Sequence, residues 1–530
     1  MQENTDPFDT TIAYQALTRL ARHPFDLTIK GAITAERIHT MQASGAGLSL
    51  LYAFERVNDL IMKELFELAA ERHALEQMQA MQNGEIVNII HGYDSEKRAV
   101  QHTALRDVFD NNKPTTEIRE AVKKELTKLK EFIQKVDTER RFSEMILIGI
   151  GGSELGPKAL FQGLAFYQRT DRKVHFIGNI DPDDVALTLR AANLAETLVV
   201  VVSKSGTTLE TATNEAFVRD AFIKEGLDPC KQFISVTMPN TPMDDPKRYL
   251  RCFHMWDSIG GRYSATSMVG GLLLSFGVGY DAFMELLRGA HDMDRIATLS
   301  DPRQNLPLLA ALLGIWRRNF LNMPTVAVIP YTTVLSRFPA HLQQLDMESN
   351  GKRIDKEGRA VSFETSPIIW GEPGTNAQHS FYQSIHQGTT RVPIEFIAFA
   401  TQQDSLDFEW KGTSSQEKLL ANVMAQAVAL ATGQQNANPN KVFPGNTPSS
   451  LLMGKKLTPY TLGSLLAYYE HKVAFQGFIW GINSFDQEGV QLGKVLADRF
   501  ITLYRAAHGK GEAEAFPMGE SLLNFVQNVR

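Results

Sequence analysis

Residues 198–208, LVVVVSKSGTT, join a short apolar run to a loop rich in hydroxyl groups. The run 198–202 is β-branched, lacks alternation and is too short for a typical helix, as expected of a strand buried on both faces. Residues 209–224 then follow an amphipathic helical pattern. A strand that enters a helix through small residues leaves unpaired N–H groups near the positive end of the helix dipole, which suits phosphate. An ordinary Ser/Thr helix cap is the alternative. The candidate phosphate ligands here are Ser203, Lys204, Ser205, Thr207 and Thr208.

Short apolar runs alternate with helical segments on both sides of this stretch, at residues 145–150, 174–178, 198–202, 233–236 and 253–256. This rhythm predicts a doubly wound parallel sheet, whose ligands gather at the carboxyl ends of the strands. The first run ends in GIGGSELG (149–156), where the glycines do not match the G-x-G-x-x-G register of a dinucleotide site. We therefore expect Gly152 and Ser153 to approach the same small ligand as the loop after residue 202.

A second α/β series follows two helical segments predicted at 269–290 and 306–320. Its strands are predicted at 326–330 and 393–400, and its long helices at 419–432 and 461–480. Residues 434–446, rich in Asn, Gln and Pro, predict a surface loop. The predicted domains are a helical lead-in with little strand (1–105), a first α/β domain (106–285), a second, larger one (286–510) and a tail (511–530).

Composition narrows the class of protein. The 530 residues are 43% hydrophobic and carry a formal net charge of −6, so the chain is globular and has no basic footprint for nucleic acid. Cys230 and Cys252 form no disulfide framework and no zinc motif, which favours a reducing, cytoplasmic compartment. Residues 1–7 lack a signal-peptide pattern, and the apolar stretch 462–482 carries Glu470 and its charged neighbours at its middle. We therefore expect a buried helix there and no membrane partner.

Four further motifs carry a family resemblance: DSIGGRYS (257–264), ESNGK (348–352), GEPGTN (371–376), and FIWGINSFDQEGV (478–490) with Gly493 and Lys494. Together they resemble the glucose-6-phosphate isomerase (phosphoglucose isomerase) family along nearly the whole chain. The resemblance implies two tandem doubly wound sugar-isomerase (SIS-type) domains with helical N-terminal and C-terminal extensions. It also implies a cytoplasmic homodimer that interconverts glucose 6-phosphate and fructose 6-phosphate in glycolysis and gluconeogenesis, without cofactor or metal.

Site roles follow from the same resemblance. Glu348 matches the base that moves a proton between C2 and C1 through a cis-enediol, and Arg262 matches the cation near the enediolate. His379, supplied in the family by the neighbouring subunit, and Lys494 match the ring-opening residues. Ser153, Ser203, Ser205 and Thr208 match the phosphate cradle, and Gln344 matches a sugar contact. The chemistry agrees, because a carboxylate base with an ordinary pKa near ~4.3 needs the product anion to be stabilised, and a guanidinium does this.

Competing interpretations stay open at this point. His386 rivals His379, Arg262 could simply pair with Asp257, and Lys494 could be an ordinary helix-face lysine. A phosphosugar isomerase that also accepts mannose 6-phosphate fits the same motifs. A sugar-phosphate amidotransferase is disfavoured because no cysteine lies near the amino terminus, and a non-catalytic phosphosugar sensor because no basic helix-turn-helix pattern is present.

Overall fold

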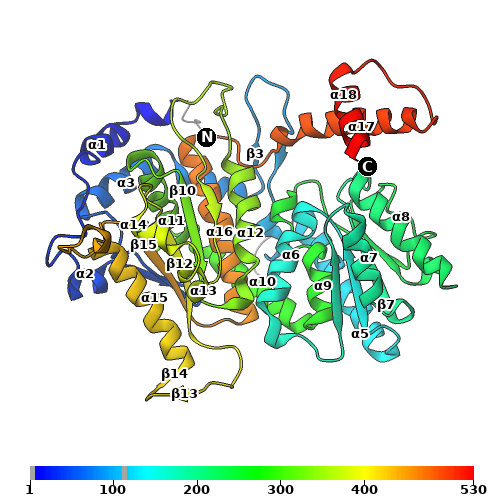
Figure 1. The fold of residues 1–530 in the computed structure, drawn as a ribbon, viewed down its shortest axis with the longest axis horizontal. Coiled ribbons are helices and arrows are strands. Elements are labelled where there is room, and N and C mark those ends of the chain that lie inside the picture. Colours follow the sequence, from blue (N-terminus) through cyan, green and yellow to red (C-terminus); the bar gives the residue numbers. More distant parts are fainter. Residues whose placement is uncertain (1–5, 110–115, 530) are drawn as a thin grey trace. The chain divides into compact units, whose positions relative to one another are not determined.

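The computed structural model describes residues 6–109 and 116–529. The chain divides into two compact units, Met1–Ser484 and Phe485–Arg530, and each is described by itself. The first unit holds both large sheets (Figure 1). The domain bounds expected at 105, 285 and 510 stay predictions.

The first sheet is five-stranded and parallel throughout, in the order β6-β5-β7-β8-β9. Its strands are β5 (Glu144–Ile148), β6 (Lys173–Ile177), β7 (Thr197–Val202), β8 (Phe233–Thr237) and β9 (Arg251–His254). Every residue of β5 and β7 is buried, and because successive side chains point to opposite faces, both faces of the sheet are covered. The predicted doubly wound parallel sheet is confirmed.

The strand order of this sheet reverses between β5 and β7. The chain leaves β5 for β6 on one side and returns to β7 on the other, so these two neighbours form the topological switch point. In open α/β sheets, ligands bind outside the carboxyl ends of the strands at this point. The loop at Gly151 follows β5 and the loop at Ser203 follows β7, so the fold brings the two predicted ligand loops to one edge.

The second sheet is six-stranded and mixed, in the order β1-β2-β15-β12-β10-β11. Its strands are β1 (Gln42–Gly45), β2 (Leu48–Leu51), β10 (Thr325–Pro330), β11 (Ile368–Trp370), β12 (Ile394–Thr401) and β15 (Ser449–Lys456). The last four are parallel, and the β1–β2 hairpin adds to β15 antiparallel. The stretch expected to be a helical lead-in with little strand contributes this hairpin, which completes the second sheet. Two short pairs complete the strands: β3 (Ile86–Asn88) with β4 (Arg98–Ala99), and β13 (Glu409–Trp410) with β14 (Thr413–Ser414).

The helices surround these sheets. In the first 300 residues they are α1 (Ile12–Leu20), α2 (Ala35–Thr40), α3 (Asp59–Glu71), α4 (Ala74–Gln82), α5 (Glu117–Glu139), α6 (Leu155–Gly163), α7 (Pro182–Ala191), α8 (Leu209–Lys224), α9 (Met268–Gly277) and α10 (Tyr280–Ile296). The later ones are α11 (Leu306–Ile315), α12 (Phe338–Leu342), α13 (Gly374–Gln378), α14 (Tyr382–Gln387), α15 (Ser415–Thr432) and α16 (Pro459–Trp480). The single helix expected at 269–290 is two, because Gly279, with φ of +119°, breaks it. The loop predicted at 434–446 is confirmed; it contains one short 3-10 turn, Pro439–Lys441.

Helix α16, drawn in orange in Figure 1, is buried almost throughout and packs along α10 and α11. Its mid-helix charges are paired inside the protein: Glu470 Oε2 accepts from Arg106 (2.6 Å), and Lys472 donates to Glu395 (2.5 Å). The predicted buried helix is confirmed, and no helix in the described part of the chain is long and apolar enough to cross a membrane. The second unit contains α17 (Gln491–Ala507) and α18 (Pro517–Val529).

Candidate active site

The loop after β7 folds its hydroxyl groups onto one another. Ser203 Oγ lies 2.9 Å from Thr208 Oγ1 and accepts from the Gly206 N–H (3.1 Å), and Ser205 Oγ lies 2.9 Å from Thr207 Oγ1. Gly206 has φ of +69°, a conformation that favours glycine in this tight turn. Thr208 is the N-cap residue of α8, yet among the described residues its side chain caps no N–H of that helix. Thr208 is therefore not an ordinary helix-capping residue, and the start of α8 has no side-chain cap.

Lys204 joins this loop to the segment before Arg262. Its Nζ donates to the carbonyls of Asp257 (2.6 Å) and Ile259 (3.1 Å) and lies 3.0 Å from Asp257 Oδ1. Burial is the main cause that lowers the Lys204 pKa from its ordinary value. Arg98 also pairs with Asp257, at 2.6 Å. The alternative that Asp257 is the partner of Arg262 is thus wrong, since Asp257 serves Lys204 and Arg98.

The glycine loop after β5 fits closely against the segment that carries Arg262. A Cβ added to Gly152 would lie 2.2 Å from the carbonyl carbon and oxygen of Gly261 and 2.7 Å from the Arg262 nitrogen. Ser153 ends this loop and is half-buried. On the other side, a Cβ on Gly151 would lie 3.2 Å from Nε2 of Gln344. The structure therefore brings Gly152, Gln344 and Arg262 to one place.

Glu348 and Arg262 meet between the two α/β halves of the first unit. Arg262 lies in η7 (Gly261–Tyr263), a 3-10 turn that follows β9, and Glu348 ends η10 (Gln343–Glu348), a π-helical turn that follows β10 and α12. Arg262 Nη1 lies 3.4 Å from Glu348 Oε1. The Arg262 side chain is 1% exposed and that of Glu348 22%, so the carboxylate can reach a ligand while the guanidinium stays inside. π-Turns recur at functional sites, and this one also carries Gln344.

Three residues to which the sequence assigned no role hold Arg262 in place. Its Nε donates to Ser349 Oγ (2.6 Å), and its Nη2 donates to the carbonyl of Ser484 (2.7 Å). Asn350 ties these segments together, because its Nδ2 donates to the α16 carbonyl of Val473 (3.0 Å) and its Oδ1 accepts from Ser484 Oγ (2.6 Å). All three lie inside the quoted motifs, which is the only signal the sequence offered.

The two candidate histidines have different surroundings. His386, on α14, lies with Nε2 2.8 Å from Gln426 Oε1, and its ring contacts Tyr382 and Phe443. His379 caps the C-terminus of α13, and its side chain is exposed. His386 is therefore held by contacts inside the protein, whereas the side chain of His379 is exposed at the surface of the chain. Lys494 is an exposed residue of α17 in the second unit, and it stays a prediction.

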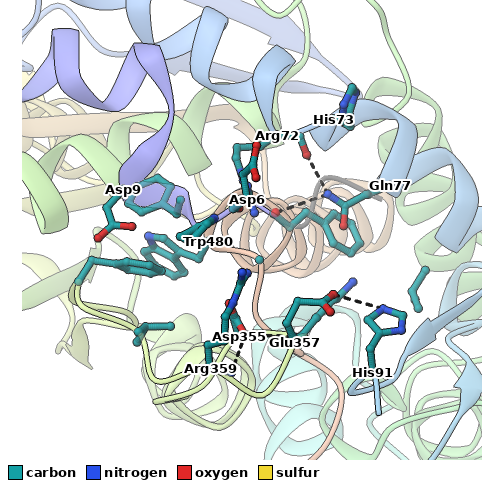
Figure 2. Close-up of a pocket in the computed structure, with 18 of the residues that line it drawn as sticks. Asp6, Asp9, Arg72, His73, Gln77, His91, Asp355, Glu357, Arg359 and Trp480 are labelled. Atoms are coloured by element: carbon teal, nitrogen blue, oxygen red, sulfur yellow. Dashed lines mark hydrogen bonds and ion pairs between the residues drawn. The ribbon is translucent and has the colours of Figure 1, made fainter. Parts of the chain in front are cut away.

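A cavity of about 360 Å³ lies elsewhere in the first unit (Figure 2). It is lined by the start of the described chain at Asp6–Asp9, by Arg72, by the 355–363 segment and by the end of α16, and none of the predicted site residues is among its described lining. Figure 2 shows its charges facing one another: Arg359 Nε donates to Asp355 (2.7 Å), and His91 lies 4.0 Å from Glu357. The Glu348–Arg262 contact therefore lies outside this cavity.

A parallel sheet with two loops of small, polar residues at its switch point is the architecture of α/β enzymes that bind small phosphorylated molecules. The phosphoglucose isomerase family model matches residues 52–514. The glucose-6-phosphate isomerase of Protochlamydia amoebophila is 54% identical over 520 residues, covering 97% of this chain and 96% of the relative, and that of Chlamydia caviae is 51% identical, covering 99% and 100%.

Solved structures agree with the sequence relatives. The crystal structure of a glucose-6-phosphate isomerase from Chlamydia trachomatis superimposes with a TM-score of 0.95 at 50% identity, covering 99% of this chain and 100% of that one. A hypothetical protein of Thermus thermophilus matches with a TM-score of 0.67 at 25% identity, covering 83% and 97%. The chain belongs to the phosphoglucose isomerase family, and the resemblance stated from its motifs is confirmed.

Proposed function

We propose that this chain is an aldose-ketose isomerase that interconverts glucose 6-phosphate and fructose 6-phosphate. The observation that carries the proposal is the contact between Glu348 and Arg262 (3.4 Å) at the place where Gly152 and Gln344 also converge. A carboxylate beside a fixed guanidinium is what proton transfer next to a carbonyl requires. Membership of the family supports the same activity.

The substrate's phosphate binds at the loop of Ser203, Ser205, Thr207 and Thr208, with Ser153 across the switch point. Hydroxyl groups and the N–H groups at the start of α8 are the donors that a phosphate prefers. Lys204 holds this loop against the carbonyls before Arg262 and adds positive charge nearby. Anchoring the phosphate fixes the far end of the open sugar and places the reacting carbons beside Glu348.

Glu348 performs the isomerisation. Its carboxylate removes the proton from C2 of the open-chain aldose, and the electrons of that C–H bond form the C1–C2 double bond of an enediolate. The proton on the C2 hydroxyl moves to O1 as the C2–O bond becomes the carbonyl, and Glu348 returns its proton to C1, which gives the ketose. The guanidinium of Arg262 is always charged and is fixed before the reaction, so it favours the enediolate over the neutral sugar.

Ring opening is assigned to His379 and Lys494. An imidazole suits this step because its ordinary pKa lies near the working pH. His379 is exposed on the single chain, which is consistent with a homodimer in which it serves the partner's site. The β13–β14 hairpin supports self-association, since Leu406, Phe408 and Trp410 are 83%, 66% and 60% exposed there. Both cysteines are free thiols, which suits the cytoplasm as the proposed location.

Conversion of fructose 6-phosphate to glucose 6-phosphate tests the proposal, read through a coupled glucose-6-phosphate dehydrogenase in buffer with EDTA. The expected result is fast turnover that EDTA leaves unchanged. A folded protein that binds fructose 6-phosphate without converting it would instead support the sensor interpretation. Mannose 6-phosphate as a second substrate tests the broader isomerase, which requires interconversion of that sugar at a comparable rate.

Mixed dimers test the shared site. Glu348→Gln and His379→Ala subunits, each inactive alone, should regain activity when they exchange partners, because one of the two sites then has both intact residues. Subunit exchange is verified with two affinity tags. Exchange without any regain of activity contradicts the assignment of His379 to the partner's site.

A further inference from the structure

Tyr263 touches the residue that holds Arg262. It is 1% exposed, and its hydroxyl oxygen lies 3.0 Å from Ser349 Oγ. The same Ser349 Oγ accepts the hydrogen bond from Arg262 Nε at 2.6 Å, and Ser349 is fully buried. A serine hydroxyl has one hydrogen and two lone pairs, so a second partner decides how it is turned toward the first. Tyr263 is that second partner.

The ring of Tyr263 packs against other buried side chains. It stacks on the His102 ring at 4.7 Å and 29°, and His102 lies 6.3 Å from the ring of His471 on α16. His471 Nε2 lies 2.6 Å from Asp294 Oδ1, and Arg106 binds the same carboxylate through two hydrogen bonds of 2.8 and 2.7 Å. These side chains are all at least nine-tenths buried. The phenol ring therefore packs in a buried cluster to which α10 contributes Asp294 and α16 contributes His471.

The phenol also keeps its proton. Burial is the main cause that raises the Tyr263 pKa to about 12, so the hydroxyl group is neutral at any working pH. Burial likewise keeps the pKa of His102 well below its usual range, so an uncharged ring lies under Tyr263. The contact between Tyr263 and Ser349 thus stays a hydrogen bond between neutral hydroxyl groups.

We propose that Tyr263 is a positioning residue of the isomerase: through Ser349 it fixes the orientation of the Arg262 guanidinium toward Glu348. The inference rests on the proposed function, in which Arg262 stabilises the enediolate. A guanidinium on a flexible stem acts on developing charge only when its N–H groups already point there. Loss of the Tyr263 hydroxyl leaves the Ser349 hydroxyl free to turn, so that Arg262 is less well oriented. The energy of the transition state then rises, whereas phosphate binding is unaffected.

Tyr263→Phe tests this, with Tyr249→Phe as the matched control. Tyr249 is also buried (2% exposed), and its hydroxyl donates to Glu215 at 2.8 Å, but it packs in the core of the first sheet. Each substitution removes one buried hydroxyl and keeps the ring. Tyr263→Phe should lower kcat for fructose 6-phosphate roughly 3- to 10-fold with KM unchanged, the loss expected for one hydrogen bond. Tyr249→Phe should leave kcat and KM unchanged, whatever it does to stability.

Ser349→Ala provides an independent arm and carries the test should Tyr263→Phe not fold. Both changes act through one contact, so Tyr263→Phe added to Ser349→Ala should lower kcat no further than Ser349→Ala alone. A wild-type kcat in Tyr263→Phe, or a double variant whose loss in kcat is the product of the two single losses, would overturn this inference but not the proposed function. A wild type without turnover, or an Arg262→Gln variant as active as wild type, overturns the proposed function and the inference with it.

Discussion

Gly152→Ala is expected to damage the site through backbone geometry alone. The added Cβ would lie 2.2 Å from the Gly261 carbonyl group and 2.7 Å from the Arg262 nitrogen, whereas such atoms essentially never approach within 3.0 Å. Both contacts are with backbone, so no side chain can swing away. The two segments must separate by roughly 1 Å, and that displacement reaches Arg262 directly.

The magnitudes follow from this displacement. Overpacking of a close contact costs about 1–3 kcal/mol of unfolding free energy. A catalytic group misplaced by about 1 Å costs on the order of 100-fold in rate. We therefore expect Gly152→Ala to lose stability by that amount and kcat for fructose 6-phosphate by roughly 10²-fold.

Gly261→Ala is the matched control for stability. A Cβ at Gly261 meets no heavy atom of the described residues within 4 Å beyond its chain neighbours, although the residue lies in the same junction. Its unfolding free energy should change by less than about 0.5 kcal/mol. Urea unfolding followed by fluorescence and a coupled turnover assay measure both variants. Wild-type stability and kcat in Gly152→Ala would refute the close approach of these two loops.

Three further predictions concern stability and the histidines. His386→Ala should lower the free energy of unfolding but leave kcat unchanged, because it removes the hydrogen bond to Gln426 and two ring contacts. His379→Ala should lower kcat but leave the stability unchanged. Thermal unfolding and turnover assays distinguish the two variants. Asn350→Ala should cost about 2–4 kcal/mol in urea unfolding, because two buried hydrogen bonds are lost. Burial lowers the pKa of His341 to about 4 from 6.5, so the folded state binds fewer protons between these values and stability falls as pH drops through this window. Between about pH 7.5 and about pH 5, the free energy of unfolding of wild type should therefore fall by about 2 kcal/mol more than that of His341→Gln. Urea titrations at several pH values measure this difference.

The first sheet could be predicted from sequence because its strands are continuous apolar runs. Residues 198–202 are fully buried in β7, and the helix predicted at 209–224 is α8 with the same bounds. The second sheet was harder. Strand β15 begins with two buried serines, of which Ser450 accepts from Arg317 (3.2 Å) inside the protein. A strand that begins with serines and ends with lysines carries a weaker apolar signal than a continuous apolar run.

The candidate site was predictable only in part for a similar reason. Motif resemblance named Glu348 and Arg262, and the structure places them in contact. It gave no role to Ser349 or Ser484, because they contact Arg262 across 87 and 222 residues of chain. The π-helical turn at Gln343–Glu348 was also not predicted. Lys494 belongs to the second compact unit, and its role in ring opening stays a prediction.

The most direct test of the central claim is the turnover of fructose 6-phosphate by wild type and by Glu348→Gln, on protein shown to be folded by its thermal transition. The amide keeps the size of the side chain and removes the base. Assignment of Glu348 as the proton-transfer base predicts fast wild-type turnover and a loss of roughly 10²- to 10⁴-fold in kcat. A Glu348→Gln variant within about twofold of wild type would contradict that assignment.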